Sequence, residues 1–336
     1  MKIVKPSVEL LHTGYETEPM TPEQLIEKVG RTCYKSEDRI SAASAVTFVG
    51  NLIKRTHEAM IEHYSPIFWA EVETYEEFVD NWEMLMHNGN LKMEDRLRPF
   101  LRFTDWTTED GVSRCVISGN MRAWRDYAKA CMEAFGFLPA YLYSPIKMFP
   151  TFFPEYNDWN PTVDPCDMLH QIGVDQLVGD LEHGVHHDVT AKFVCDRGVT
   201  HEMVRHRTSS FAQESTRYCN YSLGKFDASI SVVEPAFITH ARTQGKQEII
   251  DIWTDSNERA EQDYNRLIEL GCTPQEARSI LPTDLKAEII MTTNLYGWKH
   301  FTDLRCAPDA HPDMRVSAIQ LLDELEEKVY SRVQLS

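Results

Sequence analysis

The segment 197–218, RGVTHEMVRHRTSSFAQESTRY, holds the side chains of this sequence that are best suited to chemistry. An arginine guanidinium donates two parallel hydrogen bonds to phosphate oxygens and stays charged at any working pH. Hydroxyl groups are further donors, so the segment is a candidate binding site for a small anion. The alternative is a solvated basic helix end whose cations complement the helix dipole. The basic residues are Arg205, His206, Arg207 and Arg217, and the hydroxyl residues are Ser209, Ser210, Ser215 and Thr216.

Two other polar groups have the residue types of a metal site but not its spacing. In HEAMIEH, residues 57–63, a zinc protease motif would need histidines four residues apart, and position 61 is isoleucine. We therefore predict a solvated helix end there, with Glu58 and Glu62 facing outward. A second histidine group has no acidic or thiol partner at ligand spacing, which predicts a polar turn and no metal. Its members are His183, His186 and His187.

Composition limits the classes of function. The 336 residues include 34 Lys and Arg against 52 Asp and Glu, which gives a net charge of −18. Such a chain is unsuited to sequence-independent binding of a nucleic-acid backbone, although small anions remain possible ligands. The eight cysteines form no CxxC pair, so we expect reduced thiols and no structural zinc site. No apolar run reaches the roughly 18 residues of a membrane span and no signal peptide is recognisable, so we expect a cytoplasmic protein without membrane contact.

The N-terminal part of the chain predicts both strands and helices. Residues 3–12 are typical of an edge strand that contains a proline. The sequence Thr-Pro-Glu-Gln at 21–24 has the signals of a capping box, which predicts a helix from there to about residue 34. The apolar period of 41–57 predicts a second helix, and 66–73 is typical of a strand.

The middle part, 74–188, has a different character. We predict helices over 75–88 and 119–135, and another over about 166–182. The six prolines from position 139 to position 165 should forbid regular structure between the last two of these helices.

The C-terminal part contains the candidate anion site and the elements that must position it. A β-branched strand over 189–195 leads directly into a predicted helix over 199–207. Further strands are expected over 226–233 and 287–293. The other expected helices are a long amphipathic one over 249–271, a short one over 273–282, and two more over 294–305 and 312–333.

Four sequence blocks resemble a known enzyme family. Arg205, His206 and Arg207, followed after seven residues by Ser215, resemble the RHR-seven-S motif of flavin-dependent thymidylate synthases. Over residues 1–73 and 189–330, three more blocks resemble segments of the same family in the same order. These are HEAMIEH at 57–63, PQEARSILP at 274–282 and NLYGWKHFTDLR at 294–305.

The resemblance implies a fold and its division into parts. It implies an α+β protein in which helices pack on a small, largely antiparallel sheet, the thymidylate synthase-complementing fold, without a Rossmann unit. The absence of a GxGxxG sequence agrees with that implication. Residues 1–73 and 189–336 would form the core, and 74–188 a helical, proline-rich insertion or elaboration packed on it. SGNMRAW at 118–124 is similar to a segment of the longer family members.

The resemblance also implies an activity and an assembly. Members are methyltransferases of nucleotide biosynthesis that convert dUMP to dTMP with 5,10-methylenetetrahydrofolate as carbon donor, FAD as carrier and NADPH as reductant. They are homotetramers whose active sites are shared between subunits. The flavin does the difficult chemistry, and the protein supplies positioning and electrostatics. Two alternatives stay open: flavin-dependent hydroxymethylation of dUMP or another pyrimidine nucleotide, and a degenerate nucleotide-binding protein without catalysis.

The resemblance assigns site residues position by position. Arg305 would be the catalytic residue that polarises the uracil ring, because a cation beside the ring stabilises developing negative charge. Ser215 and Arg217 would bind around the phosphate rather than attack carbon. The positions implied for dUMP are Glu202, Arg205, Gln213, Glu214, Ser215, Thr216, Arg217, Arg278 and Arg305. The positions implied for FAD are Ala59, Arg205, His206, Arg207, Gln213, Asn294, Tyr296 and His300.

Four positions depart from the family pattern. Ala59 stands where Thr is common, Glu202 where Gln is common, and Ala212 and His300 where Asn is common. Glu202 matters most, because an anion cannot donate to a phosphate and must accept from the base, the ribose or a neighbouring arginine. Base preference therefore stays open. So do the choice of NADPH over NADH, the role of 74–188 and the subunit that supplies each residue.

Overall fold

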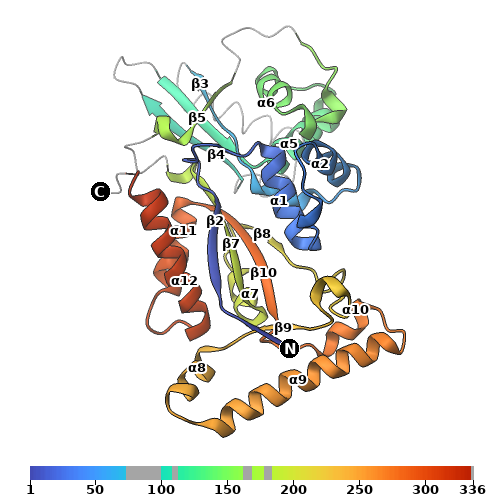
Figure 1. The fold of residues 1–336 in the computed structure, drawn as a ribbon. Coiled ribbons are helices and arrows are strands. Elements are labelled where there is room, and N and C mark those ends of the chain that lie inside the picture. The colour runs from blue at the N-terminus through green and yellow to red at the C-terminus, as the bar shows by residue number, and fades with distance from the viewer. Residues whose placement is uncertain (73–99, 108–112, 162–168, 178–183, 334–336) are drawn as a thin grey trace.

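The computed structural model describes residues 1–72, 100–107, 113–161, 169–177 and 184–333 of the chain. Within these ranges helices pack on two four-stranded antiparallel sheets, which confirms the α+β class (Figure 1). None of the described helices is both long and apolar enough to cross a membrane.

A central antiparallel sheet carries the segments that hold the candidate anion site. Its inner strands are almost wholly buried and rich in β-branched and aromatic residues, which suit a pleated, packed surface. Its strand order is β2 (Ser7–His12), β7 (Asp188–Asp196), β10 (Lys286–Asn294) and β8 (Ser210–Gln213).

The strand β2 lies at an edge of this sheet, as predicted, but the predicted strand over 3–12 is divided. A separate strand, β1 (Lys2–Val4), pairs in parallel with β9 (Ser231–Val233). Pro6 lies between β1 and β2, where its missing N–H group costs no ladder hydrogen bond. The predicted strand over 226–233 is confirmed only in its last three residues.

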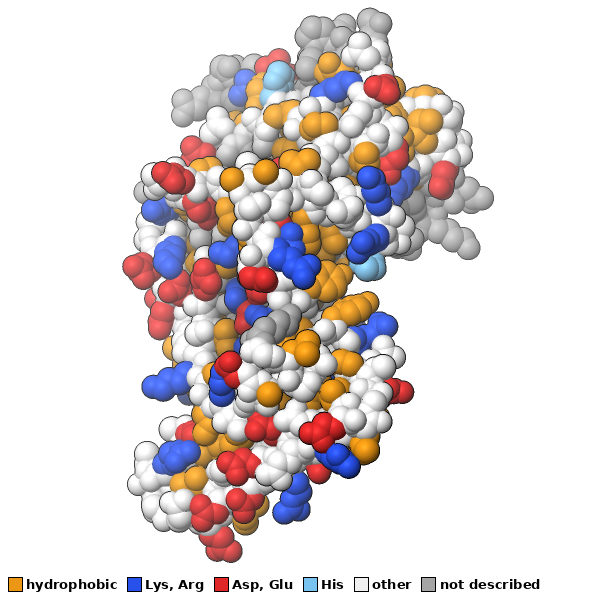
Figure 2. Space-filling model, turned by 45° about the vertical axis from the view of Figure 1, so that its right-hand side comes forward, with side chains coloured by type: hydrophobic (Ala, Val, Ile, Leu, Met, Phe, Trp, Pro, Cys, Tyr) orange, Lys and Arg blue, Asp and Glu red, His pale blue; other side chains and the backbone are white. Residues whose placement is uncertain are grey.

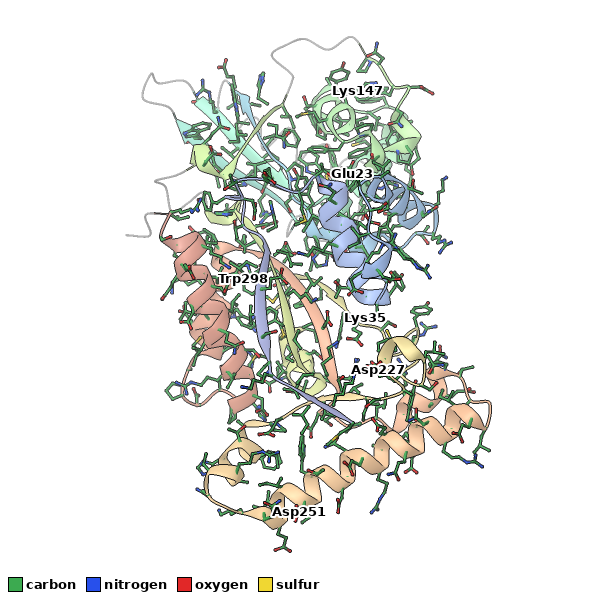
Figure 3. All side chains as sticks on the ribbon, viewed as in Figure 1. Glu23, Lys35, Lys147, Asp227, Asp251 and Trp298 are labelled. Carbon is green, nitrogen blue, oxygen red and sulfur yellow. The ribbon has the colours of Figure 1, made fainter. Side chains whose placement is uncertain are left out.

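Helices cover both faces of the central sheet. One face packs against α7 (Arg197–Met203), α11 (Leu295–Arg305) and α12 (Pro312–Leu325). Figure 1 shows α11 and α12 side by side along this face, and Trp298 lies between α11 and the strands (Figure 3). On the other face, α1 (Pro22–Tyr34) packs Leu25 against Ile290. Each such burial stabilises the fold by about 1.5–3 kcal/mol, so these contacts decide how helices and strands meet.

Local capping residues decide where these helices begin. The side chains and backbone N–H groups of Thr21 and Gln24 bond reciprocally, which confirms the predicted capping box of α1. Asp196 caps α7 and Asn294 caps α11, each accepting a first-turn N–H at 2.8 and 2.9 Å. Both caps are the last residues of strands, so β7 and β10 each turn directly into a helix. The residues that follow are therefore placed at the ends of the sheet.

A second antiparallel sheet joins the N-terminal segment to residues of 74–188. Its order is β4 (Leu101–Thr107), β5 (Ser113–Gly119), β3 (Ile67–Glu71) and β6 (His170–Ile172). One face packs against α2 (Ser44–Lys54) and α5 (Met121–Phe135), with the rings of Phe68 and Trp124 5.5 Å apart. The described part of 74–188 thus shares a sheet and a hydrophobic core with the segment before residue 73.

The remaining helices lie beyond one end of the central sheet. They are α8 (Ala236–Thr243), the long α9 (Gln247–Glu269) and α10 (Pro274–Ala277), followed by a 3-10 turn at Arg278–Ile280. In Figure 1 α8 and α9 lie across the lower end of the molecule. Trp253 and Tyr264 of α9 share a core with Val232 of β9. The predicted long helix and the predicted short helix that follows it are both confirmed.

Several predictions differ from the structure. The predicted helix over about 166–182 is wrong where it is described, because β6 and a 3-10 turn at Val174–Leu177 occupy that stretch. The proline-rich segment contains a short helix, α6 (Tyr143–Met148), since Pro145 lies in its first turn, where no N–H group is needed. The predicted helix over 75–88 lies outside the described residues. The sequence analysis did not predict β4, β5, β8 or α8.

Candidate functional site

A cavity of about 590 Å³ opens where the two sheets and the beginning of α11 meet. This volume falls within the range of small-molecule sites, about 300–1,000 Å³. Most of the residues that the sequence assigns to FAD line this cavity: Arg205, His206, Arg207, Asn294, Tyr296 and His300.

The turn after α7 brings the RHR sequence to this cavity. The predicted helix over 199–207 is too long, since α7 ends at Met203 and turns follow. The helix cannot continue because β8, which begins at Ser210, must return antiparallel to β10. His206 is 8% exposed and its ring lies 4.8 Å from that of Phe301, whereas Arg205 and Arg207 are exposed.

The cavity favours an anion. Within the described ranges, neither Arg205 nor Arg207 forms an ion pair. The first turn of α11 also lines the cavity, through Asn294, Tyr296 and Gly297, and a helix N-terminus carries partial positive charge. Unpaired guanidinium groups beside such a helix end fit phosphate or pyrophosphate oxygens.

Arg305 lies at the other end of α11 and contacts two of the predicted site residues. Its Nη1 is 2.6 Å from Oε2 of Glu202, and its Nη2 donates to the Glu202 backbone oxygen at 3.1 Å. Its Nε donates to Nε2 of His206 at 3.2 Å. Of the three acceptor roles open to Glu202, the structure therefore shows the one toward a neighbouring arginine.

His206 is a neutral ring in this arrangement. Burial, then the positive charge of Arg305, then His300 lower the pKa of His206 to about 4. Because Nε2 accepts a hydrogen bond from Arg305, the ring proton lies on Nδ1. The side chain can therefore donate from one nitrogen at neutral pH without bringing charge to the cavity.

A second group of predicted residues gathers after β8. Arg278 donates to the Thr216 hydroxyl at 3.3 Å, and Arg217 donates through Nε to Gln275 at 2.9 Å. The Ser215 hydroxyl accepts the backbone N–H of Arg217 at 3.3 Å. The loop after β8 and the segment after α9 thus bring two arginines and two hydroxyls together, the donor types that a nucleotide phosphate requires.

Glu214 begins this loop and is bound by protein donors on both carboxylate oxygens. Lys286 lies 2.8 Å from Oε2, and the Tyr221 hydroxyl donates to Oε1 at 3.2 Å. The Glu214 residue is 2% exposed. Its carboxylate therefore holds the loop in place in this chain.

The structure does not bring all predicted residues to one place in a single chain. Ala59 is exposed and does not line the cavity, and Gln213 donates to Thr200 at 2.9 Å instead. Arg205 precedes β8 and Arg217 follows it. The four residues of β8, each advancing about 3.3 Å, therefore lie between the RHR turn and the loop that holds Arg217.

The family described as thymidylate synthase complementing protein matches residues 177–329, a range that holds the RHR turn, β8, the loop after it and α11. This part of the chain is therefore similar to that family.

Curated relatives agree with that match. The flavin-dependent thymidylate synthase of Pyrococcus horikoshii is 32% identical over 134 residues, which cover 40% of this chain and 52% of that protein. The enzyme of the same name from Haloarcula marismortui is 31% identical over 137 residues, 36% of this chain and 56% of that protein. The chain spans about half the length of these relatives.

A solved structure also has some likeness to this chain. It is a UMP/dUMP methylase PolB from Streptomyces cacaoi bound with 5-Br UMP, and it is 23% identical with a TM-score of 0.37. The match covers 44% of this chain and 74% of that one.

The block HEAMIEH lies outside the range matched by the family and corrects a prediction. Glu58 and Glu62 do not face outward, because α5 packs over this segment and supplies cations to both. Glu58 pairs with Arg125 at 3.2 Å, and Glu62 pairs with Arg122 at 2.6 Å. The sequence analysis had no means of finding these partners, which lie more than 50 residues away along the chain.

The predicted polar turn of histidines is likewise buried. His186 is fully buried between the hydroxyls of Thr104 and Ser118, each 2.8 Å from a ring nitrogen. His187 contacts the backbone oxygen of Thr13 at 2.5 Å. These rings join β4 and β5 to the central sheet and have a structural role; His183 lies outside the described residues.

Sequence reasoning missed the cavity residues that come from 74–188. Asn120 had one usable signal, since it precedes a helical stretch and caps α5. Arg102 and Asp188 had none, because they pair across 86 residues of chain. The missed residues are Phe100, Arg102, Asn120, Val185 and Asp188.

Proposed function

We propose that the protein is a flavin-dependent thymidylate synthase, which converts dUMP to dTMP with 5,10-methylenetetrahydrofolate as carbon donor, FAD as carrier and NADPH as reductant. The observation that carries this proposal is the pair Arg205 and Arg207, without ion-pair partners among the described residues, in a cavity that also receives the neutral ring of His206. This arrangement falls within the range that matches the family.

The residues around the cavity fit a flavin dinucleotide. Arg205 and Arg207 would hold the pyrophosphate, and the first turn of α11 would add backbone donors. Tyr296, 42% exposed, and the His300 ring offer flat surfaces beside them. When bound, FAD supplies transfer of hydride and of a one-carbon unit, so the protein needs no nucleophile of its own.

The nucleotide would be held by the second group. Arg217 and Arg278 are suited to the phosphate, with the hydroxyls of Ser215 and Thr216 as further donors. Arg305 would place positive charge beside the pyrimidine, where it stabilises negative charge that develops on the ring. Glu202 lies 2.6 Å from that guanidinium and would set its orientation.

The protein would act as a homotetramer with shared active sites. The residues assigned to FAD and the loop after β8 lie on opposite ends of that strand, so a second subunit would complete each site. We also propose that residues 1–73 and 189–336 form the catalytic core, with 74–188 as an elaboration on it.

A flavin spectrum of the purified protein, recorded with and without dUMP, tests the proposal. We expect a yellow protein whose absorbance changes when dUMP is added and which oxidises NADPH only when dUMP is present. The mass of the nucleotide product distinguishes methylation from hydroxymethylation. A colourless protein that takes up no FAD would defeat the proposal.

A further inference from the structure

Five described residues of the segment 74–188 line the 590 Å³ cavity. Phe100 and Arg102 come from the beginning of β4, Asn120 follows β5, and Val185 and Asp188 precede or begin β7. This segment lies mostly before the range that matches the family. The opposite wall is made by the RHR turn and by α11, so the ligand space lies between the elaboration and the family core.

Arg102 ties this wall to the family core. Its two terminal nitrogens donate to the two Asp188 oxygens at 2.6 and 2.8 Å, a bidentate pair, and Nη1 also donates to the Val185 backbone oxygen at 2.7 Å. Burial alone would raise the pKa of Asp188, but the Arg102 charge and its hydrogen bonds outweigh burial and lower it. The carboxylate is therefore ionised and holds the planar guanidinium in one orientation.

The same Val185 oxygen connects Arg102 to a residue assigned to FAD. Asn294 donates to this oxygen through Nδ2 at 3.0 Å. With its side-chain oxygen, Asn294 caps α11 through the Gly297 N–H at 2.9 Å. One carbonyl thus receives donors from β4 and from the start of α11, so the position of Arg102 fixes the position of the helix end that lines the cavity.

A second arginine of the elaboration, Arg122, also contacts a residue that lines the cavity. Arg122 of α5 lies 2.6 Å from Oε1 of Glu62, and Oε2 of Glu62 accepts from the Ser210 hydroxyl at 3.1 Å. Glu62 and Ser210 both line the cavity. The elaboration therefore orients cavity residues through two independent arginines.

These contacts leave the wall without net charge. Arg102 is neutralised by Asp188 and Arg122 by Glu62, so Arg205 and Arg207 remain the cavity cations without ion pairs in the described ranges. The wall then contributes shape and exclusion of water, which strengthen the attraction of the two arginines for an anion in the cavity.

We propose that Phe100, Arg102, Asn120, Val185 and Asp188 form one wall of the flavin cavity and that Arg102 is a positioning residue for flavin binding, an inference that rests on the proposed function. Arg102 acts through the Val185 carbonyl and Asn294, and Arg122 acts through Glu62. The elaboration is thus part of the cofactor site.

Titration of the flavin-free protein with FAD, followed by flavin fluorescence, tests this assignment. We expect Arg102→Met to weaken FAD binding about tenfold or more, and Arg102→Lys to recover little of it, because lysine lacks the planar fork. Arg122→Met should weaken FAD binding several-fold. The Arg122 side chain is 36% exposed, so this variant should fold even if Arg102→Met does not.

Arg114→Met is the matched control. Arg114 lies on the neighbouring strand β5, pairs with Glu71 at 3.5 Å and covers the Trp69 ring at 4.5 Å, away from the cavity. The variant Arg114→Met should lower the melting temperature and leave the affinity for FAD unchanged. Wild-type affinity in both Arg102→Met and Arg122→Met, or an equal loss in Arg114→Met, overturns the assignment. A wild-type protein that binds no FAD overturns the proposed function and this assignment with it.

Discussion

At the scale of single residues, burial and a neighbouring charge decide the protonation of the cavity residue His206. Arg305 donates to Glu202 and His206 at once, and its positive charge adds to burial in keeping the imidazole neutral. A protonated His206 would bring two cations together in a half-buried place, which is unfavourable. The charge available beside the cavity is therefore set by a three-residue contact.

We expect Arg305→Ala to raise the pKa of His206 from about 4 toward its ordinary value of 6.5, because the change removes a cation and leaves Glu202 nearby. Turnover should fall about 100-fold while FAD stays bound, since Arg305 does not line the cavity proposed for FAD. NMR titration of the histidine ring and a steady-state assay measure the two effects. An unchanged pKa of His206 would contradict the role given to Arg305.

A buried histidine should make the protein less stable in acid. Burial lowers the pKa of His63, whose Nδ1 lies 2.7 Å from the Thr292 hydroxyl, from 6.5 to about 3. Between these values the unfolded chain binds a proton that the folded protein does not, so the free energy of unfolding falls as pH falls. From pH 6.5 to about pH 5 this residue alone should lower it by about 2 kcal/mol.

Chemical denaturation of the wild type and of His63→Gln at these two pH values checks this expectation. The variant should lose less stability than the wild type on acidification, because glutamine does not titrate. His311→Gln is the control, since the side chain of His311 is 56% exposed. If the wild type and His63→Gln lost the same unfolding free energy on acidification, the role given to His63 would be refuted.

At the scale of elements, a buried cluster of charges joins α1 to the central sheet and to the loop after β8. Glu288 is surrounded by Lys35 at 2.7 Å, Lys192 at 2.6 Å and Lys286 at 2.7 Å. Burial alone would raise the pKa of the Glu288 carboxyl, but these cations outweigh burial and hold it well below its ordinary value. Figure 3 shows Lys35 at the end of α1 nearest the strands. The backbone N–H groups of Glu214 and Ser215 donate to Glu288 and Cys33, so the cluster and the loop share one framework.

Two lysines of this cluster allow a matched comparison. Lys286 contacts both Glu288 and Glu214, whereas the pair recorded for Lys192 is with Glu288. Lys286→Met should raise the KM for dUMP about tenfold, equivalent to about 1.4 kcal/mol, with kcat nearly unchanged, because the loop loses its anchor. Lys192→Met should leave that KM unchanged, although both variants melt at a lower temperature. Equal KM values in the two variants would show that the cluster only stabilises the fold.

At the scale of the whole molecule, a strongly acidic chain carries local groups of arginines on exposed positions. Figure 2 shows Asp and Glu side chains interspersed with Lys and Arg side chains, both over the lower part of this face and near its middle. The net charge of −18 therefore coexists with local cation sites in the cavity and after β8. A net negative charge disfavours polyanions, and the proposed binding of a small anion would depend on these local arginines.

We expect inactive single variants to restore one another if sites are shared between subunits. Arg217 follows β8, whereas Arg305 contacts His206 in the turn before it, so a shared site would take one of these two arginines from each subunit. Random mixing of Arg217→Ala and Arg305→Ala by co-expression should recover about a quarter of wild-type activity, because that fraction of sites receives both intact arginines. The activity of each variant alone is the baseline. If co-expression restored no activity, Arg217 and Arg305 would belong to a site formed by a single chain.

The sequence by itself determined the local features of this protein. The caps at Thr21 and Asn294 start helices wherever the chain folds, because each bonds a backbone group three residues away. The candidate anion site was likewise predicted from the sequence, since Arg205 and Arg207 lie in one short motif that needs no distant partner to be recognised. The long helix α9 followed from the period of its apolar residues.

Only the tertiary structure decided the rest. Arg102 meets Asp188 across 86 residues, Arg122 meets Glu62 across 60, and Arg305 meets His206 across 99. No local pattern encodes these pairs, because each depends on the sheet register and on the packing of α5 and α11. The glutamates of HEAMIEH, predicted to face outward, form partly buried ion pairs for the same reason. The strands β4 and β5 are stabilised mainly by distant neighbours, so which residues close the cavity was settled by packing and not by propensity.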